Sequence, residues 1–250
     1  MMKTGLIAVA AGLFVSTVAF PAMAQGGAED IARGFVFEAK PGMATQFEEA
    51  IKLHVQWRKQ NNDPWTWVWY QVVNGDNIGQ YLVRSGNHRW ADLDAYDAWQ
   101  SRVGVSAHID TTVSPYVESV SSSITQLNSA LSRPLEDYGT ITLFAVTEFD
   151  LRLPNQFIGA IAKYVEALDQ GNWGRPYLWQ MGANGGTTDA ALVFPAENWA
   201  GLAPPAKALP EMLAEVYGEQ EASDLMQQLA SSIRSQTSYT LRVRPDLSLP

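Results

Sequence analysis

The sequence predicts an α+β fold in which two tandem βαββαβ repeats each form a four-stranded antiparallel sheet with two helices on one face. One observation behind this prediction is that the chain matches itself at an offset of about 110 residues. The matched residues on the first helix of each half are Phe47 with Phe157, Ile51 with Ile161, and Val55 with Val165. The other observation is that apolar runs typical of strands and apolar stripes at helical spacing follow in the same order in both halves. We therefore expect a first repeat over 25–137 and a second over 138–250.

Further matches keep their order along both halves, and the offset changes by only one or two residues between blocks. The matched positions are Glu38 with Glu148, Trp69 with Trp179, Asn74-Gly75 with Asn184-Gly185, Leu82-Val83 with Leu192-Val193, Trp90 with Trp199, and Arg133-Pro134 with Arg244-Pro245. Small insertions between matching blocks are what divergence after a gene duplication leaves. Two helices that were similar by chance would not keep strand, turn and terminal matches in order.

Each half is predicted to run strand, helix, strand, strand, helix, strand. The first three strands are expected over 35–39, 65–73 and 81–85 in one half and over 140–149, 177–183 and 190–194 in the other. Asn74-Gly75 and Asn184-Gly185 predict hairpin turns, because Asn and Gly accept the positive φ that such turns require. The second helices are expected to carry Val113, Tyr116, Val117, Val120 and Ile124 in one half and Leu225, Met226, Leu229 and Ile233 in the other. The last strands are expected to end near the two Arg-Pro pairs.

The first helix of each half follows a Pro-containing turn and has one apolar face. This face carries Phe47, Ala50, Ile51, His54, Val55 and Arg58 in the first half, and Phe157, Ala160, Ile161, Tyr164, Val165 and Leu168 in the second. The strand over 65–73 is apolar on both sides, with three tryptophans on one and Val68, Tyr70 and Val72 on the other. Because both faces of this ferredoxin-like sheet look buried, we expect the second sheet to pack against the first and cover it.

This order of elements resembles the dimeric α/β-barrel superfamily, in a form where the two halves of one chain replace two subunits. The resemblance is topological and covers nearly the whole chain after residue 24. The sequence motif Trp90-Ala91-Asp92-Leu93-Asp94-Ala95-Tyr96, which follows the third strand, is similar to one found in the family. The superfamily includes cofactor-free monooxygenases of aromatic substrates, muconolactone-isomerase-like enzymes, and haem proteins of the chlorite-dismutase and dye-peroxidase type. The resemblance therefore implies a fold and a ligand cleft between sheet and helices, and it leaves the activity open.

The N-terminus has the three parts of a secretory signal peptide: Lys3, an apolar stretch over 5–20, and Ala22-Met23-Ala24. We expect cleavage after Ala24, a periplasmic or secreted location, and no membrane anchor after cleavage. The formal net charge is −9, and removal of Lys3 makes it −10, so nucleic acid is excluded as a partner. The chain contains no cysteine, which excludes disulfides and thiolate chemistry.

His54 and Arg58 are the candidate catalytic residues, because both lie one turn apart on the apolar face of the first helix. We expect His54 to act as a base or anchor and Arg58 to hold an anion or enolate. Ligand contacts are expected from Trp67, Trp69, Tyr70, Glu38 and Tyr164. Glu38 is also a candidate counter-charge for Arg58. Its alignment with Glu148 predicts two carboxylates at equivalent strand positions. These two carboxylates either meet inside the barrel or face water at a strand edge. The alternative is that His54 is a hydrogen-bonded core residue and Arg58 extends to solvent.

The function favoured by these residues is binding of a small apolar or aromatic molecule, with cofactor-independent monooxygenase or isomerase activity. Two alternatives stay open: a haem-binding enzyme or carrier that uses a helix-borne histidine such as His54 or His108, and a non-catalytic periplasmic interaction module whose cleft is packed solid. No metal site is expected, because the three histidines are scattered. Motifs of hydrolases, metalloproteases, nucleotide triphosphatases and dehydrogenases do not occur in the sequence. We expect a monomer or a weak homodimer.

Overall fold

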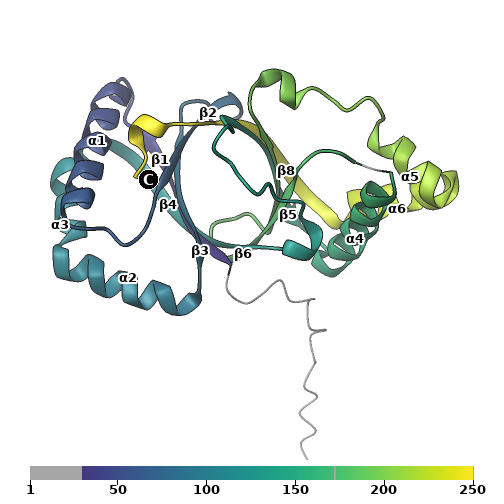
Figure 1. The fold of residues 1–250 in the computed structure, drawn as a ribbon, viewed down its shortest axis with the longest axis horizontal. Coiled ribbons are helices and arrows are strands. Elements are labelled where there is room, and N and C mark those ends of the chain that lie inside the picture. The colour runs from purple at the N-terminus through teal and green to yellow at the C-terminus, as the bar shows by residue number, and fades with distance from the viewer. Residues whose placement is uncertain (1–29, 172, 250) are drawn as a thin grey trace, which may run out of the picture.

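The computed structural model describes residues 30–171 and 173–249. Its eight strands form one closed antiparallel barrel in the order β1-β3-β2-β8-β5-β7-β6-β4 (Figure 1). The strands are β1 (Ile31–Ala39), β2 (Val68–Gly75), β3 (Tyr81–His88), β4 (Val117–Leu127), β5 (Leu143–Leu151), β6 (Leu178–Gly185), β7 (Ala190–Ala196) and β8 (Ile233–Val243). The predicted signal peptide over 1–24 lies outside the described residues and stays a prediction, as do the repeat boundaries at 25–137 and 138–250.

Each half contributes four neighbouring strands in the ferredoxin-like order, and the predicted α+β fold of two tandem repeats is confirmed. The two sheets face each other across the barrel interior, as expected. They are also joined edge to edge, because β2 pairs with β8 and β4 pairs with β6. These two seams close the barrel, so that none of the eight described strands has an unpaired edge.

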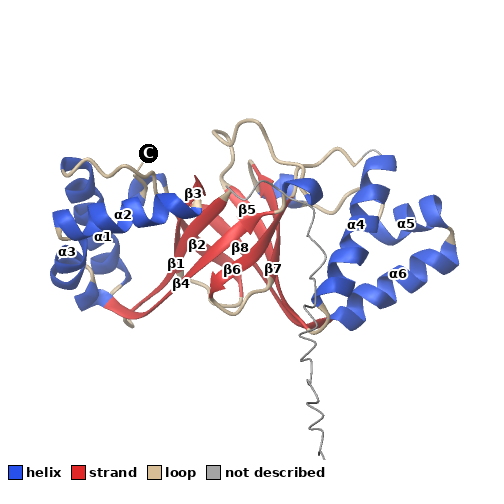
Figure 2. Cartoon of the chain, turned by 90° about the horizontal axis from the view of Figure 1, so that it is seen from below, coloured by secondary structure: helices blue, strands red, loops and turns tan. Residues whose placement is uncertain are grey.

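Each half contributes three α-helices, and the two sets lie on opposite sides of the barrel (Figure 2). The helices are α1 (Ala44–Gln60), α2 (Trp90–Val103) and α3 (Val105–Thr112) in the first half, and α4 (Pro154–Gln170), α5 (Leu209–Tyr217) and α6 (Glu219–Ser232) in the second. Short 3-10 turns lie at Ser114–Tyr116, Ser129–Leu131, Trp199–Leu202 and Pro245–Leu247. Within the described part of the chain, no helix has the length and apolar character needed to cross a membrane.

The second helix predicted around 113–124 is wrong. Residues 117–127 form β4, which pairs with β1 on one side and β6 on the other, while α3 ends at Thr112 and only the 3-10 turn at Ser114–Tyr116 follows it. The valines, isoleucine and serines of this segment are compatible with a strand as well as with a helix that has one apolar face. The segment forms a strand because β1 and β6 both offer backbone hydrogen bonds to it. In the second half the prediction is correct up to Ser232, and Ile233 begins β8.

The predicted equivalence of Glu38 and Glu148 is also wrong. The α1 and α4 helices are offset by 110 residues, but β1 and β5 are offset by 112, because the connection from strand to helix is two residues shorter in the second half. Phe37 and Phe149 therefore occupy equivalent positions, each beside the phenylalanine that begins the apolar face of the following helix. Glu38 corresponds to Asp150 and is exposed, whereas Glu148 corresponds to Val36 on the inward face.

Each half ends in a segment that crosses over to the other half. After β4, the Asn128 amide donates to the Trp179 carbonyl (2.9 Å) and the Trp179 amide donates to Ser132 Oγ (2.9 Å). After β8, the Arg244 amide donates to the Trp69 carbonyl (2.8 Å) in the same way. Asn128 and Arg244 are thus equivalent, so the predicted match of the two Arg-Pro pairs is wrong.

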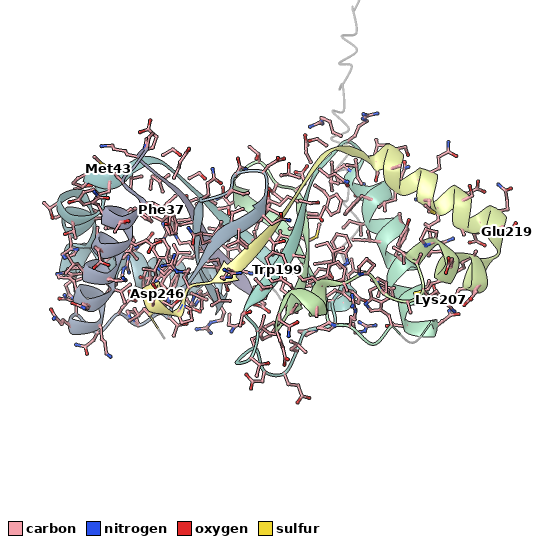
Figure 3. All side chains as sticks on the ribbon, turned by 90° about the horizontal axis from the view of Figure 1, so that it is seen from above. Phe37, Met43, Trp199, Lys207, Glu219 and Asp246 are labelled. Carbon is pink, nitrogen blue, oxygen red and sulfur yellow. The ribbon has the colours of Figure 1, made fainter. Side chains whose placement is uncertain are left out.

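The segment over 244–249, which we call the C-terminal strap, holds the strand that leads into β2. The Trp69 amide donates to Ser248 Oγ (2.9 Å), and Trp67 and Leu249 exchange two backbone hydrogen bonds of 2.8 Å. Arg244 adds two bonds of 2.7 Å to the Glu48 carboxylate on α1. Figure 3 shows Asp246 of this strap on the side of the first-half helices, away from Lys207 and Glu219. Two tryptophans of the first half therefore depend on the last residues of the second.

Candidate ligand-binding site

A cavity of about 490 Å³ lies between the first-half sheet and helices α1, α2 and α3. Its walls are mainly apolar and aromatic, as is usual for small-molecule sites, and its volume is in the range of such sites. The wall residues include Phe35, Phe37, Ile51, Val55, Trp67, Trp69, Val83, Val105, Ile109 and Val113. The cavity therefore lies on the outer face of β1, β2 and β3, where the resemblance implies a ligand cleft.

His54 and Arg58 both line this cavity, because they lie one turn apart on the sheet-facing side of α1. The Arg58 Nε–H donates to Nε2 of His54 (2.7 Å), and Nδ1 of His54 lies 2.9 Å from Nδ1 of His108 on α3. Arginine can only donate, so Nε2 of neutral His54 must be unprotonated and its proton must be on Nδ1. His54 then donates to His108, whose own proton must be on Nε2.

This arrangement keeps both histidines neutral. Burial, followed by the charges of Arg58 and His108, lowers the pKa of His54 from its usual 6.5 to about 3. Burial and Arg58 also lower the pKa of His108. A proton added to either ring would replace an acceptor nitrogen with a donor and break one of the two hydrogen bonds.

Arg58 forms a buried ion pair with Asp63, which follows the end of α1. Its Nη1 donates to Oδ2 of Asp63 (2.6 Å), and the side chains are 11% and 0% exposed. The second oxygen of Asp63 accepts from the Trp65 amide (2.9 Å). A buried carboxylate with these partners anchors the guanidinium in one position.

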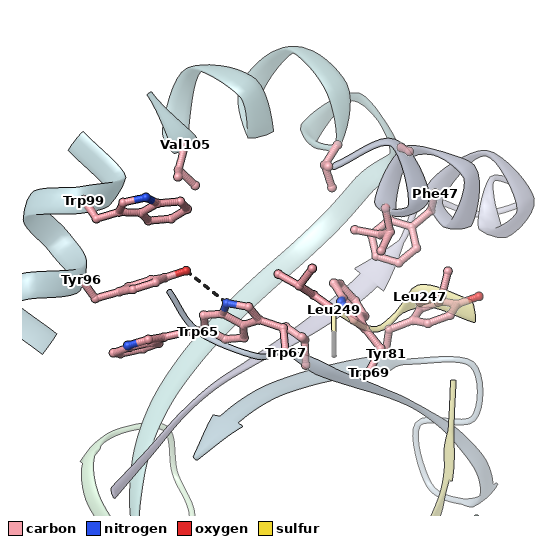
Figure 4. Close-up of a cluster of buried hydrophobic side chains, with 14 residues drawn as sticks. Phe47, Trp65, Trp67, Trp69, Tyr81, Tyr96, Trp99, Val105, Leu247 and Leu249 are labelled. Atoms are coloured by element: carbon pink, nitrogen blue, oxygen red, sulfur yellow. Dashed lines mark hydrogen bonds between the residues drawn. The ribbon is translucent and has the colours of Figure 1, made fainter. Parts of the chain in front are cut away.

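Tyr96 on α2 completes the polar end of the cavity. Its hydroxyl accepts from Arg58 Nη1 (2.6 Å) and from Trp67 Nε1 (3.1 Å), and it donates to Oδ2 of Asp63 (3.0 Å). Burial raises the pKa of Tyr96, so the phenol stays protonated and keeps this donor. The Tyr96 ring is stacked between Trp65 (centroids 3.8 Å apart) and Trp99 (5.3 Å), as Figure 4 shows with its bond to Trp67.

Polar side chains from β1, α2 and α3 also line the cavity. Arg33 donates to Asp97 (3.0 Å), and this pair is partly exposed. Gln100 donates to the same carboxylate (2.9 Å), and Ser101 and Ser106 lie at the cavity as well. Because exposed ion pairs contribute little energy, the Arg33–Asp97 pair can open at small cost.

The other predicted ligand-binding residues lie elsewhere. Tyr70 is on the inward face of β2, where its ring meets Phe144 at 5.6 Å. Glu38 is exposed at the end of β1 and accepts from Ser119 Oγ (3.2 Å). Tyr164 packs among α4, α5 and α6 in the second half. Of the predicted site residues, His54, Arg58, Trp67 and Trp69 therefore lie together at the cavity. Tyr70, Glu38 and Tyr164 lie away from it.

Asp63 and Tyr96 were not predicted as site residues, and His108 was considered only as a haem ligand and not as a partner of His54. Asp63 had a detectable signal, since a buried Arg58 needs an internal acid and Asp63 lies five residues further along. Tyr96 is the last residue of the motif over 90–96 that is similar to one found in the family. In the second half, Leu168 and Trp173 occupy the positions of Arg58 and Asp63, so this polar network belongs to the first half alone.

No protein-family model matches the sequence, and no curated protein matches it. Among solved structures, an anthrone oxidase-like protein is similar to this chain with a TM-score of 0.53 and 9% sequence identity. A proposed monooxygenase from Fusobacterium nucleatum subsp. nucleatum ATCC 25586 has a TM-score of 0.52 and 14% identity. A mutant chlorite dismutase from Candidatus Nitrospira defluvii has a TM-score of 0.51 and 8% identity. Each match covers 86% of this chain and 92% of the other. The chain has the dimeric α/β-barrel fold. At these identities the likeness establishes that architecture, and the activity must be argued from the site.

In this dimeric α/β barrel, His54 does not fit as the axial ligand of a haem. An axial histidine needs a free ring nitrogen, but both nitrogens of His54 are bonded, to Arg58 and His108. Tyr164, at the equivalent position of the second half, packs against Leu213 and Leu225. Over the described residues, no group of three or more histidines and carboxylates could hold a metal ion.

The low pKa of His54 predicts that the protein loses stability in mild acid. Between pH 6.5 and 3 the unfolded chain binds a proton at His54 that the folded chain does not, so stability is complete above pH 6.5 and declines below it. We expect a loss of about 2 kcal/mol from pH 6.5 to 5, measured by urea unfolding. In this window most carboxylates are still ionised. The H54Y variant, which carries the tyrosine of the second half, should flatten the decline, and an equally steep decline in H54Y would refute the assignment.

Proposed function

We propose that this chain is an exported protein whose first-half cavity binds a small apolar or aromatic molecule bearing one acceptor oxygen. We further propose that it acts on this molecule as a cofactor-independent monooxygenase or isomerase. The observation that carries the proposal is a cavity with aromatic walls and a single fixed cation, Arg58, at its buried polar end. The monooxygenase-like structures named above have the same fold, which supports the proposal without deciding the reaction.

The proposed role of Arg58 is to bind the developing negative charge on a substrate oxygen. Its Nε and Nη1 donate to His54, Asp63 and Tyr96, and Nη2 has no partner among the described residues. A donor that is held in place before the reaction stabilises an enolate or phenolate without the cost of reorganisation. The aromatic walls exclude water and hold the ring of the substrate.

The proposed role of His54 depends on that same oxygen. While the Arg58 Nε–H donates to Nε2 of His54, this nitrogen has no free lone pair for a substrate proton. A substrate oxygen that takes over the Nε–H would release Nε2, which could then accept a proton from the adjacent carbon. In an oxygenase the resulting enolate is oxidised by molecular oxygen, whereas in an isomerase the proton returns at another carbon.

The activity can be tested with anthrone, an aromatic ketone chosen because of the anthrone oxidase-like structure. Anthrone and one molecule of oxygen give anthraquinone and water, so oxygen uptake and anthraquinone absorbance should rise together above the rate in buffer. We expect the double variant Arg58→Leu with Asp63→Asn to lower the catalysed rate by about 10²–10³, since it removes the donor together with its buried partner. The Y164F variant, at the position equivalent to His54 in the second half, is the matched control and should keep the rate.

Binding must be measured separately from turnover. Anthrone in the cavity should quench the fluorescence of Trp67 and Trp69, and native mass spectrometry of protein taken from its own periplasm should show a retained small molecule. Quenching without oxygen uptake would favour the isomerase. A protein that carries no molecule, shows no quenching and consumes no oxygen would contradict the proposal and favour the non-catalytic module.

A further inference from the structure

The barrel interior is filled at one seam between the halves and open at the other. At the β2–β8 seam, large inward side chains form an apolar cluster that includes Val72, Val146, Leu241, Tyr70 and Tyr239. We call this seam the filled end. Its compact packing is what a small eight-stranded barrel normally achieves with its own side chains.

The opposite seam, between β4 and β6, carries small or polar residues at the equivalent positions. Gly34 pairs with Ser123 here, where the filled end has the pair of Val146 and Tyr239. Thr125 pairs with Gly182, where the filled end has the pair of Leu241 and Val72. Gln180 likewise takes the place of Tyr70. The lost side-chain volume leaves a cavity of about 340 Å³, which we call the open end.

Gln180 presents an unused donor group to this cavity. The residue is 6% exposed, and its Oε1 accepts from Arg84 (2.8 Å) and from Thr125 Oγ1 (3.3 Å). Because arginine can only donate, the orientation of the amide is determined and Nε2 must be the other terminal atom. Nε2 has no protein partner among residues 30–171 and 173–249, so it is free to donate to a molecule in the cavity.

Glu148 presents an acceptor to the same cavity. It lies on the same inward face as Gln180, since both pair with Ala191 of the strand between them. One carboxylate oxygen accepts from the Tyr239 hydroxyl (2.9 Å), and the other has no partner in the described part of the chain. Ser121 and Ser123, which share the inward face of β4, add hydroxyl groups, and Thr187 and Thr188 also line the cavity.

We propose that the open end of the barrel is a second binding site, for a small neutral polyhydroxy molecule such as a monosaccharide or polyol. Such a molecule both donates and accepts, so it can satisfy Gln180 Nε2 and Glu148 at once. Arg84 and Glu148 bring opposite charges to the inward face, which favours a neutral occupant over an ion. The site shares no lining residue with the first cavity, because it lies on the opposite face of β1 and β3.

The proposal is tested by calorimetric titration of the mature protein with D-glucose, D-ribose and glycerol at millimolar concentrations. We expect saturable binding of at least one of them, and loss of that binding in the S123Y variant, which fills the open end with the residue found at the filled end. The E148Q variant should bind at least tenfold more weakly, whereas E38Q, at an exposed carboxylate of the other half, should bind as the natural protein does.

The double variant of Arg58 and Asp63 should also retain this binding, so failure of the first site and failure of the second site give different results. Absence of saturable binding for all three compounds in the natural protein would overturn the proposal and leave a water-filled cavity. Undiminished binding in E148Q would overturn it as well, and this variant keeps the test decisive if S123Y does not fold.

Discussion

The D63A variant is expected to lose about 3–5 kcal/mol of stability, because it leaves the buried guanidinium of Arg58 without its counter-charge. The Trp65 amide and the Tyr96 hydroxyl lose an acceptor in the same variant. Urea unfolding at pH 7 measures the effect directly. Since Arg58 is the cation of the proposed site, quenching by anthrone should weaken in parallel.

The R58L variant provides the control, because it introduces the leucine that the second half carries at this position. If the stability loss of D63A comes from the unpaired charge of Arg58, the R58L/D63A double variant should be more stable than D63A alone, since no unpaired charge is left in the core. A double variant whose loss equals the sum of the two single losses would show that Asp63 and Arg58 contribute independently, against our interpretation.

The L247A variant should lose about 2–5 kcal/mol, because Leu247 of the C-terminal strap is fully buried against the first-half core. The same substitution should weaken anthrone binding, since the strap holds the backbone of Trp67 and Trp69. Urea unfolding and tryptophan fluorescence measure these two effects.

The matched control for L247A is L131A, at the equivalent position of the crossing segment after β4. It should cost a similar amount of stability and leave binding in the first-half cavity unchanged, because that segment holds Trp179 instead. Equal loss of binding in both variants would mean that general destabilisation, and not the position of the two tryptophans, accounts for the effect.

Much of the fold was predictable because its two halves carry the same patterns. The apolar stripes of α1 and α4 carry the same Phe, Ala, Ile and Val at equivalent positions, so the internal match was clear there. The strand register was not predictable from that match, since the two-residue difference before the helices shifts β1 against β5. Such a shift keeps the same side chains on the same face, so alternation alone does not reveal it.

The candidate site was predictable only where its residues share one element. His54 and Arg58 follow from their spacing on α1, and Trp67 and Trp69 from the alternation of one strand. Tyr70 was assigned to the same wall although its parity places it on the opposite face, inside the barrel. Asp63, Tyr96 and His108 come from a loop and two other helices, so their contacts with Arg58 and His54 depend on how these elements pack. Of the three, only Asp63 had a signal in the sequence, because it lies five residues after Arg58.

Three properties of this protein could be predicted from its sequence alone: the duplication, the α+β fold of each half, and the presence of a histidine and an arginine on an otherwise apolar helix face. These properties are local, because they depend on residues a few positions apart or on one repeat offset. Three other properties became visible only in the folded chain: Arg58 is neutralised by Asp63, the last residues of the second half hold the tryptophans of the first, and one end of the barrel is hollow. Each of these depends on the volumes and charges of side chains from distant segments, which meet only when the barrel closes.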